Sequence, residues 1–202
     1  MVTAAKHVDP RVKRTRKLLQ QAFIELFQEK GFSAISIQDI TGRATVNRAT
    51  FYAHFTDKYD LMDSVIREEF QRAVADQLPS DPGWNITSLR ALIRATFDFL
   101  DRFHHGCKPT NTPFPLMERA IQQELANMLL GWLKQAVPRS AANASRGVPA
   151  KTLASVLSWA IFGTAVQWSH SERTTTVEEM TNQVVVVLTE GATRLAPGLS
   201  PA

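Results

Sequence analysis

Cysteine and long apolar runs are nearly absent from this chain of 202 residues. The single cysteine, Cys107, cannot form an internal disulfide, and this usage is typical of a reducing compartment. No uninterrupted apolar stretch reaches about 18 residues, so no membrane span is expected. The N-terminus is basic and lacks the apolar segment of a signal peptide. These absences predict a cytoplasmic protein.

Motifs of enzyme active sites are also missing. The sequence has no glycine-rich phosphate loop, no nucleophile elbow, no HExxH pair and no paired zinc-ligand spacing. His104, His105 and Cys107 form a compact H-H-x-C group, but they lack the two separated ligand pairs of a structural zinc site. We therefore expect no enzymatic activity, no cofactor and no metal. A metal- or thiol-responsive role of this group stays open as an alternative.

The net charge of +4 is unevenly distributed. Residues 1–60 contain ten Lys or Arg against six Asp or Glu, whereas residues 61–202 contain thirteen of each. Asp9 and Pro10 have the positions of a helix N-cap and first helical residue, and basic side chains crowd this helix start. Cations at the positive end of a helix dipole cost about 0.3–1 kcal/mol each, unless a polyanion lies nearby. A solvated tail is the alternative, but the placement favours DNA as the partner. The basic residues are Lys6, Arg11, Lys13, Arg14, Arg16 and Lys17.

Residues 36–58, SIQDITGRATVNRATFYAHFTDK, predict two short helices joined by a tight turn. Ser36 and Asp39 have the spacing of a capping box. Val46 is the apolar side chain expected inside the turn, and Asn47 is a good N-cap for the second helix. A helix this short is marginal alone, so we expect it to be held against its neighbour. A helix-turn-helix presents its second helix to the major groove of DNA.

The second of these helices has two chemically different flanks. Phe51 and Phe55 lie four residues apart and are expected to close over the first helix and the turn. The remaining side chains mostly point to the other faces. These are Arg48, Thr50, Tyr52 and His54.

The same stretch resembles the DNA-binding domain of the TetR family of transcriptional regulators. The resemblance covers about residues 10–62, and its most specific part is the string Thr50-Phe51-Tyr52-x-His54-Phe55-x-x-Lys58. Thr45 stands where the family usually has glycine, so we expect a less relaxed turn. Asn47 replaces the commoner serine and keeps the cap. The resemblance implies a repressor that a small molecule releases from its operator.

Individual side chains of this region predict distinct DNA contacts. Arg48 and Thr50 open the second helix and are expected at base edges, since arginine can bind guanine with two hydrogen bonds and a threonine methyl can touch thymine. Tyr52, His54 and Lys58 are expected at phosphates. An ordinary structural role is the alternative for these three residues. Contacts to the DNA backbone are expected for Ser36, Thr45 and Arg43, and Asn47, the N-cap of the second helix, is a further candidate DNA-binding residue.

The remainder of the sequence predicts helices, so the predicted fold class is all-α. An N-terminal three-helix helix-turn-helix domain (residues 1–60) is followed by a helical effector-binding and dimerisation domain (residues 61–202). Helices are expected over about 10–30, 57–78, 85–105, 115–137, 149–169 and 177–195, besides the two short ones. Val184–Val187 is a β-branched run, but the apolar spacing around it is helical over five turns, so we expect a helix there.

The last two helices carry more apolar residues than a single surface layer needs. The predicted interface joins two helices from each subunit, as the family resemblance implies, and two recognition helices would then read a palindromic operator. An ordinary core is the alternative. The interface residues are Leu153, Val156, Leu157, Ala160, Ile161, Thr164, Trp168, Val177, Met180, Val184, Val187 and Leu188.

The resemblance also implies a small-molecule pocket in the second domain. The candidate lining residues are Phe97, Leu100, Phe103, His104, Met117, Trp132 and Trp168, each of which has an ordinary core position as its alternative. The sequence thus predicts a DNA-binding homodimer that is controlled by a small-molecule effector of unknown identity. A ligand-independent architectural DNA-binding dimer is the competing hypothesis.

Overall fold

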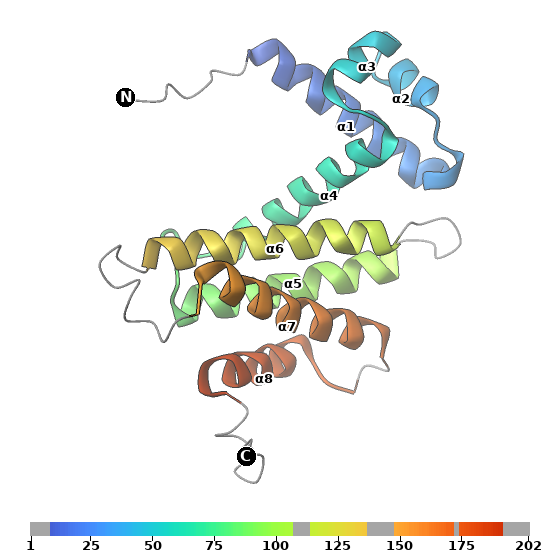
Figure 1. The fold of residues 1–202 in the computed structure, drawn as a ribbon. Helices are drawn as coiled ribbons and strands as arrows, with labels where there is room; N and C mark the ends of the chain where they lie inside the picture. Colours follow the sequence, from blue (N-terminus) through green and yellow to red (C-terminus); the bar gives the residue numbers. More distant parts are fainter. Residues whose placement is uncertain (1–8, 107–113, 137–147, 172–173, 192–202) are drawn as a thin grey trace, which may run out of the picture. The chain divides into compact units, whose positions relative to one another are not determined.

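The computed structural model describes residues 9–106, 114–136, 148–171 and 174–191, which form α-helices and one short 3-10 helix (Figure 1). No strand occurs among these residues, so the predicted all-α class is confirmed. None of the helices that they form has the length and the apolar character that a bilayer crossing needs. In chain order the elements are α1 (Pro10–Lys30), η1 (Phe32–Ala34), α2 (Ile37–Arg43), α3 (Arg48–His54), α4 (Lys58–Ala75), α5 (Ile86–Gly106), α6 (Phe114–Ala136), α7 (Ala150–His170) and α8 (Val177–Glu190).

The described residues divide into two compact units, and the division falls within α4 between Ile66 and Arg67. The first unit contains residues 9–66 and 114–117. The second contains residues 67–106, 118–136, 148–171 and 174–191.

Local signals in the sequence fix the helix ends of the first unit. Asp9 caps α1 by accepting the backbone N–H of Arg11 at 2.8 Å, and Gly31 ends the helix with φ 74°. Ser36 and Asp39 form the predicted capping box of α2. Asn47 Oδ1 accepts the Thr50 backbone N–H at 2.7 Å and so begins α3. Each of these bonds satisfies a backbone donor that a helix end would otherwise leave unpaired.

The core of the first unit lies where α1, α2 and α3 meet. In the ribbon, α2 and α3 lie beside α1, and α2 contacts both of the others (Figure 1). Leu18 of α1 is 45% exposed, whereas its neighbours Leu19 and Gln20 are buried. Gln20 enters the core because its Nε2 donates to Ser64 Oγ at 2.9 Å. The fully or nearly fully buried side chains include Leu19, Phe23, Leu26, Ile35, Ile40, Phe51, Phe55, Leu61 and Met62.

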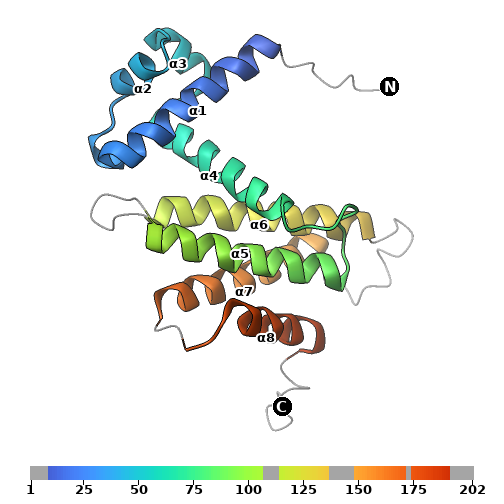
Figure 2. The ribbon, with the colours of Figure 1, turned by 180° about the vertical axis from the view of Figure 1, so that it is seen from behind.

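In the second unit α5 packs against both α7 and α8. Both views show α6 running beside α5 in the opposite direction (Figures 1 and 2). Asn85 caps α5 by accepting the Ser88 backbone N–H at 2.8 Å. The run Val184–Val187 is helical as predicted.

Two predicted helix ends were too late. The helix expected to continue to residue 78 ends at Ala75, and the residues between it and Pro79 form a turn in which the Gln77 N–H donates to the Val74 carbonyl at 3.0 Å. The last helix was expected to reach residue 195 but ends at Glu190, where Gly191 adopts φ 77° and closes it. Leu195 lies outside the described residues.

Candidate DNA-binding surface

Helix α3 separates its apolar and polar flanks as its sequence predicts. Phe51 is fully buried and Phe55 nearly so, with their ring centroids 5.9 Å apart. On the opposite flank Tyr52 is 48% exposed and Arg48 is exposed. Arg48 Nη2 donates to the Tyr52 hydroxyl oxygen at 3.3 Å, and the guanidinium lies 5.7 Å from the tyrosine ring centroid. An aromatic hydroxyl and a guanidinium therefore stand together on the solvent side of a firmly docked helix.

Thr50 and His54 lie between these two flanks and are half-buried. Thr50 Oγ1 donates to Asn47 Oδ1 at 2.9 Å, so its hydroxyl belongs to the cap of α3. The His54 ring lies 6.4 Å from that of Phe55. Arg16 reaches across from α1, with its guanidinium 4.4 Å from the Phe55 ring centroid and its Nη1 donating to the His54 carbonyl at 3.5 Å. Arg16 therefore helps to fix α3 on α1.

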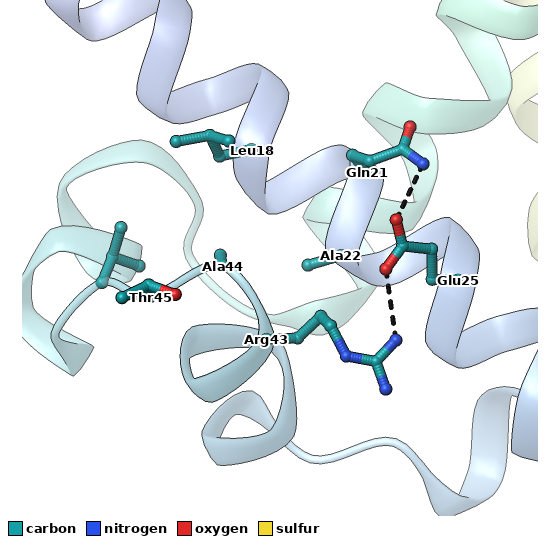
Figure 3. A pocket seen from close by; sticks show the side chains of 8 residues that line it. Leu18, Gln21, Ala22, Glu25, Arg43, Ala44 and Thr45 are labelled. Carbon is teal, nitrogen blue, oxygen red and sulfur yellow. Dashed lines mark hydrogen bonds and ion pairs between the residues drawn. The ribbon is translucent and has the colours of Figure 1, made fainter.

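Arg43 was predicted as a backbone contact, but its guanidinium binds α1 instead. It donates to Glu25 Oε2 at 3.2 Å (Figure 3). It also donates to Glu29 Oε1 at 2.8 Å. Hydrogen bonds from Gln21 and Arg43 lower the pKa of Glu25, and the bond from Arg43 lowers the pKa of Glu29. In this arrangement the side chain ties α2 to α1.

Lys58 begins α4 as expected, yet its ammonium also points inward. Nζ donates to the carbonyl oxygens of Ile35 at 2.9 Å and of Phe32 at 3.2 Å, and it lies 4.5 Å from the Phe32 ring centroid. It thereby satisfies one backbone acceptor at the start of η1 and one just after it. A phosphate contact would require Lys58 to exchange these partners.

The N-terminal half of α1 presents cations to solvent. Arg11, Lys13, Arg14 and Lys17 are exposed. Lys13, Arg14 and Lys17 line a shallow groove of about 560 Å³. A second groove, of about 400 Å³, lies between α1 and the turn before α3, where Leu18 and Thr45 are among its walls (Figure 3). Lys6 lies outside the described residues. The basic surface and the polar flank of α3 belong to the same compact unit.

Residues 19–65 match the family model described as bacterial regulatory proteins, tetR family. These residues therefore form a DNA-binding domain of the type found in that family. The match includes α2, the turn and α3, whose geometry is that of a helix-turn-helix. TetR-family proteins are regulators, in agreement with the predicted absence of an enzymatic function.

The chain is 43% identical over 63 residues to the uncharacterised HTH-type transcriptional regulator YxbF of Bacillus subtilis (strain 168), covering 31% of this chain and 17% of that protein. It is 35% identical over 114 residues to the TetC protein of transposon Tn10 from Escherichia coli, covering 55% and 57%. The chain therefore spans less than two thirds of the length of either relative.

One solved structure is similar in fold over most of the chain, beyond the residues that the family model matches. It is Thermus thermophilus FadR, described as a TetR family transcriptional repressor in complex with lauroyl-CoA. The TM-score is 0.53 and the identity 21%, over 88% of this chain and 94% of that one.

The TetR-type turn of this chain has one strained residue. Thr45 adopts φ 56°, the left-handed conformation that glycine tolerates best. A β-branched residue is rarely found there, because its side chain crowds the backbone. The expected strain in the turn, inferred from threonine at the usual glycine position, is thus present.

Thr45→Gly is expected to raise the free energy of unfolding of the first unit by about 1 kcal/mol. The left-handed conformation costs roughly 1–2 kcal/mol for a residue with a Cβ atom, and the greater flexibility of unfolded glycine offsets part of this gain. Hydrogen exchange of the α2 and α3 amides in the full chain measures the change. The control is Ala34→Gly, at an exposed position of η1 without positive φ, which should lower stability. Equal losses in both variants would show that the turn is unstrained.

The predicted effector residues are mostly buried in the second unit. Phe97, Leu100, Phe103, Trp132 and Trp168 have little or no exposed surface. The Phe97 and Trp168 ring centroids are 5.5 Å apart, and Trp168 Nε1 donates to the Thr175 carbonyl at 2.9 Å. The structure therefore gives these side chains core packing, and an effector role remains a prediction.

Two other predicted effector residues lie in different surroundings. Met117 is buried but groups with the first unit. The His104 side chain is 5% exposed and is hydrogen-bonded through both ring nitrogens, to Ser169 Oγ at 2.7 Å and to Glu118 Oε1 at 3.0 Å. Burial lowers the pKa of His104, while the hydrogen bond with Glu118 acts in the opposite direction.

The predicted dimer residues divide between the core and the surface of the second unit. Val156 and Val187 are exposed, at 61% and 49%. The apolar residues of α7 occupy more than one face of the helix. The buried members of the predicted interface therefore pack inside the unit and are not available on its surface. Trp159, 58% exposed, and Val186 were left out of the predicted interface although both are exposed. Half-buried positions are Leu153, Ala160, Thr164, Val177, Met180 and Leu188; buried positions are Leu157, Ile161, Trp168 and Val184.

Proposed function

We propose that this chain is a sequence-specific DNA-binding transcriptional regulator, with the DNA-binding function in its N-terminal domain. This proposal rests mainly on the exposed pair of Arg48 and Tyr52 on α3. Buried Phe51 and Phe55 fix the other flank of the same helix. A docked helix places its outer side chains in defined positions, as reading of base edges in the major groove requires.

The side chains of the first unit support a division of roles. Arg48 and Thr50 are the proposed base-reading residues, and Tyr52 and His54 the proposed phosphate contacts. Ser36, Thr45 and Asn47 lie at the α2 cap, the turn and the α3 cap, where their main chain can approach the DNA backbone. Arg43 and Lys58 act in our proposal by holding the domain together, because both already have internal partners. The exposed cations of α1 supply attraction that does not depend on base sequence.

Selection from randomised duplex DNA tests this function. We expect enrichment of one palindromic sequence, because two copies of the same recognition helix would read identical half-sites about one helical turn apart. Recovery of unrelated sequences with equal affinity would contradict a sequence-specific regulator and leave a ligand-independent architectural role.

The palindrome requires a homodimer, and we propose that the exposed apolar side chains of α7 and α8 form its interface. Val156 and Trp159 lie three residues apart on α7, so they share one helical face, and Val187 is exposed on α8. Closed two-fold assemblies are the commonest oligomers, and exposed tryptophan is a typical interface anchor.

Trp159→Glu is expected to convert the dimer to a monomer at concentrations where the unaltered protein is dimeric. A buried, unpaired carboxylate in the interface would face a large desolvation cost, while the subunit itself should keep its fold because Trp159 is mostly exposed. Sedimentation analysis measures the assembly. Trp84→Glu, which changes another exposed tryptophan outside α7 and α8, is the matched control and should remain dimeric. A dimeric Trp159→Glu variant would exclude this surface.

We further propose that the regulator is a repressor released by a small-molecule effector that binds the second unit. The neighbour with the same fold is described as a repressor in complex with lauroyl-CoA, which makes an acyl-CoA the first probe. An effector acts only if it binds the DNA-releasing state better than the DNA-binding one. A thermal-shift screen headed by lauroyl-CoA should reveal stabilisation by mass action. A chain that ignores the whole library would favour the architectural alternative.

A further inference from the structure

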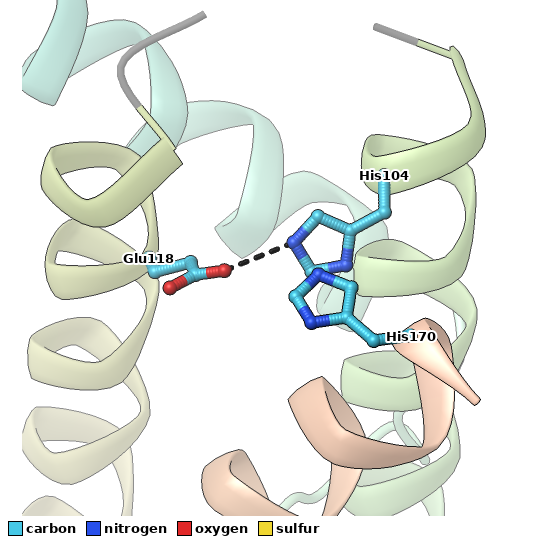
Figure 4. Close-up of side chains that lie close together, drawn as sticks. All are labelled: His104, Glu118 and His170. Atoms are coloured by element: carbon cyan, nitrogen blue, oxygen red, sulfur yellow. Dashed lines mark hydrogen bonds and ion pairs between the residues drawn. The ribbon is translucent and has the colours of Figure 1, made fainter. Parts of the chain in front are cut away.

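Three ligand-type side chains from three different helices converge in the second unit. His104 comes from the end of α5, Glu118 from the first part of α6 and His170 from the end of α7 (Figure 4). One nitrogen of each imidazole and one carboxylate oxygen all lie within 4.8 Å of one another. Within residues 9–106, 114–136, 148–171 and 174–191, no other three such groups come this close. The cluster is thus a built feature of the helix packing rather than a run of neighbours in sequence.

The hydrogen bonds around His104 prepare one of its nitrogens to face the cluster. Ser169 Oγ donates to the Val166 carbonyl at 2.8 Å, so it accepts from His104 Nδ1 at 2.7 Å. His104 Nε2 then lies 3.0 Å from Glu118 Oε1. A ring nitrogen and a carboxylate oxygen this close need a positive charge between them, which is either a proton or a metal ion. A metal-binding histidine usually donates its other ring N–H to a carboxylate, a backbone carbonyl or water, and the Ser169 hydroxyl takes that position here.

The second histidine completes the group from the solvent side. The ring centroids of His104 and His170 are 4.3 Å apart. His170 is exposed, whereas the side chain of His104 is 5% exposed and that of Glu118 is 21% exposed. The cluster therefore has two largely enclosed ligands and one at the surface.

We propose that His104, Glu118 and His170 form a binding site for one divalent transition-metal ion of the zinc class. Two imidazoles and one carboxylate with an open fourth position are a known zinc ligand set. Zinc–ligand distances of about 2.0–2.2 Å place tetrahedral ligands roughly 3.3 Å apart. The present separation of up to 4.8 Å is larger, so ion binding would draw the ligand atoms together, and the exposed His170 is the ligand that we propose moves. The bound ion would cross-link the ends of α5, α6 and α7.

This site differs from the H-H-x-C group in the sequence. His105 has a different partner, since its Nδ1 lies 2.9 Å from the Asp101 carbonyl oxygen. Cys107 lies outside the described residues. His104 is the only member shared by both groups. The proposal concerns metal binding itself and stands independently of the proposed DNA binding.

Calorimetric titration of the chelator-treated full chain with Zn²⁺ tests the proposal. We expect one ion per chain, and a visible spectrum of tetrahedral type when Co²⁺ replaces Zn²⁺. Loss of a ligand should weaken binding by about 100-fold or more, since even groups that only orient a ligand change affinity by about 10–100-fold. The variants are His170→Asn, at an exposed position that leaves the core intact, and Glu118→Gln, which keeps the side-chain shape. The matched control is His105→Asn, which should bind Zn²⁺ like the unaltered chain.

Three results would overturn the site. The first is the absence of stoichiometric Zn²⁺ binding to the unaltered chain. The second is an unchanged Zn²⁺ affinity in both His170→Asn and Glu118→Gln, when equal melting temperatures of the metal-free proteins show that both variants fold like the unaltered chain. The third is loss of binding in His105→Asn alone, which would place the ion on the neighbouring sequence group instead.

Discussion

Phe51→Ala is expected to lower the free energy of unfolding of the first unit by about 3–5 kcal/mol. The phenylalanine is fully buried and packs against Phe55 in the core of the helix-turn-helix. Its truncation removes the burial energy of the ring and leaves a cavity that the short helix α3 cannot close. Because the chain has two compact units, hydrogen exchange of the α1, α2 and α3 amides is a better measure than a single global transition.

Tyr52→Ala is the matched control for this prediction. Tyr52 is the next residue on the same helix but is 48% exposed, so its truncation should change stability by no more than about 0.5 kcal/mol. Both variants should bind DNA less well, the first through loss of structure and the second through loss of contact. Strong unfolding by Tyr52→Ala with little effect of Phe51→Ala would show that α3 is docked by the other flank.

Arg48→Ala should lower affinity for the selected duplex by about 1–3 kcal/mol and relax the base preference at one position in each half-site. The guanidinium is exposed and is oriented by the Tyr52 hydroxyl at 3.3 Å. The loss should be much smaller on a scrambled duplex, where the side chain has no matching guanine. Fluorescence anisotropy with both duplexes at several salt concentrations measures it.

Lys13→Ala provides the comparison for a contact that depends only on charge. Lys13 lies in the exposed basic groove of α1. Its loss should weaken both duplexes alike and reduce the salt slope by about one. If Arg48→Ala also weakened both duplexes equally, Arg48 would be a phosphate contact and not a reader of bases.

The local structure of the first unit was accessible from sequence because short-range rules determine it. The Ser36–Asp39 box, the Asn47 cap and the inward Phe51 and Phe55 all depend on spacings of three or four residues. The strain at Thr45 was foreseeable for the same reason, since the turn needs a positive φ whichever residue occupies it.

The binding partners of long charged side chains could not be predicted from such local spacings. Arg43 reaches Glu29 fourteen positions earlier in the chain, and Lys58 reaches the Ile35 carbonyl twenty-three positions earlier. Such partners depend on how the helices pack, which no local pattern encodes. Both residues were therefore predicted to face DNA, although their charged groups have partners within the domain.

The same limit applies to the second unit. Helical spacing identified α7 and α8 as strongly apolar but did not show which apolar face turns inward, so buried Leu157 and exposed Val156 were assigned to one interface. The grouping of His104 with Glu118 and His170 arises only when three helices are packed, and the sequence pointed to the adjacent His105 and Cys107 instead.

We propose above that the polar flank of α3 is the surface that meets DNA. The most direct measurement is an NMR titration of the isotope-labelled full chain with the duplex obtained by selection. We expect the largest shifts on residues 47–54, above all on the exposed Arg48 and Tyr52, while the signals of α7 and α8 stay in place. Unchanged signals at residues 47–54, with the largest shifts elsewhere in the chain, would contradict it.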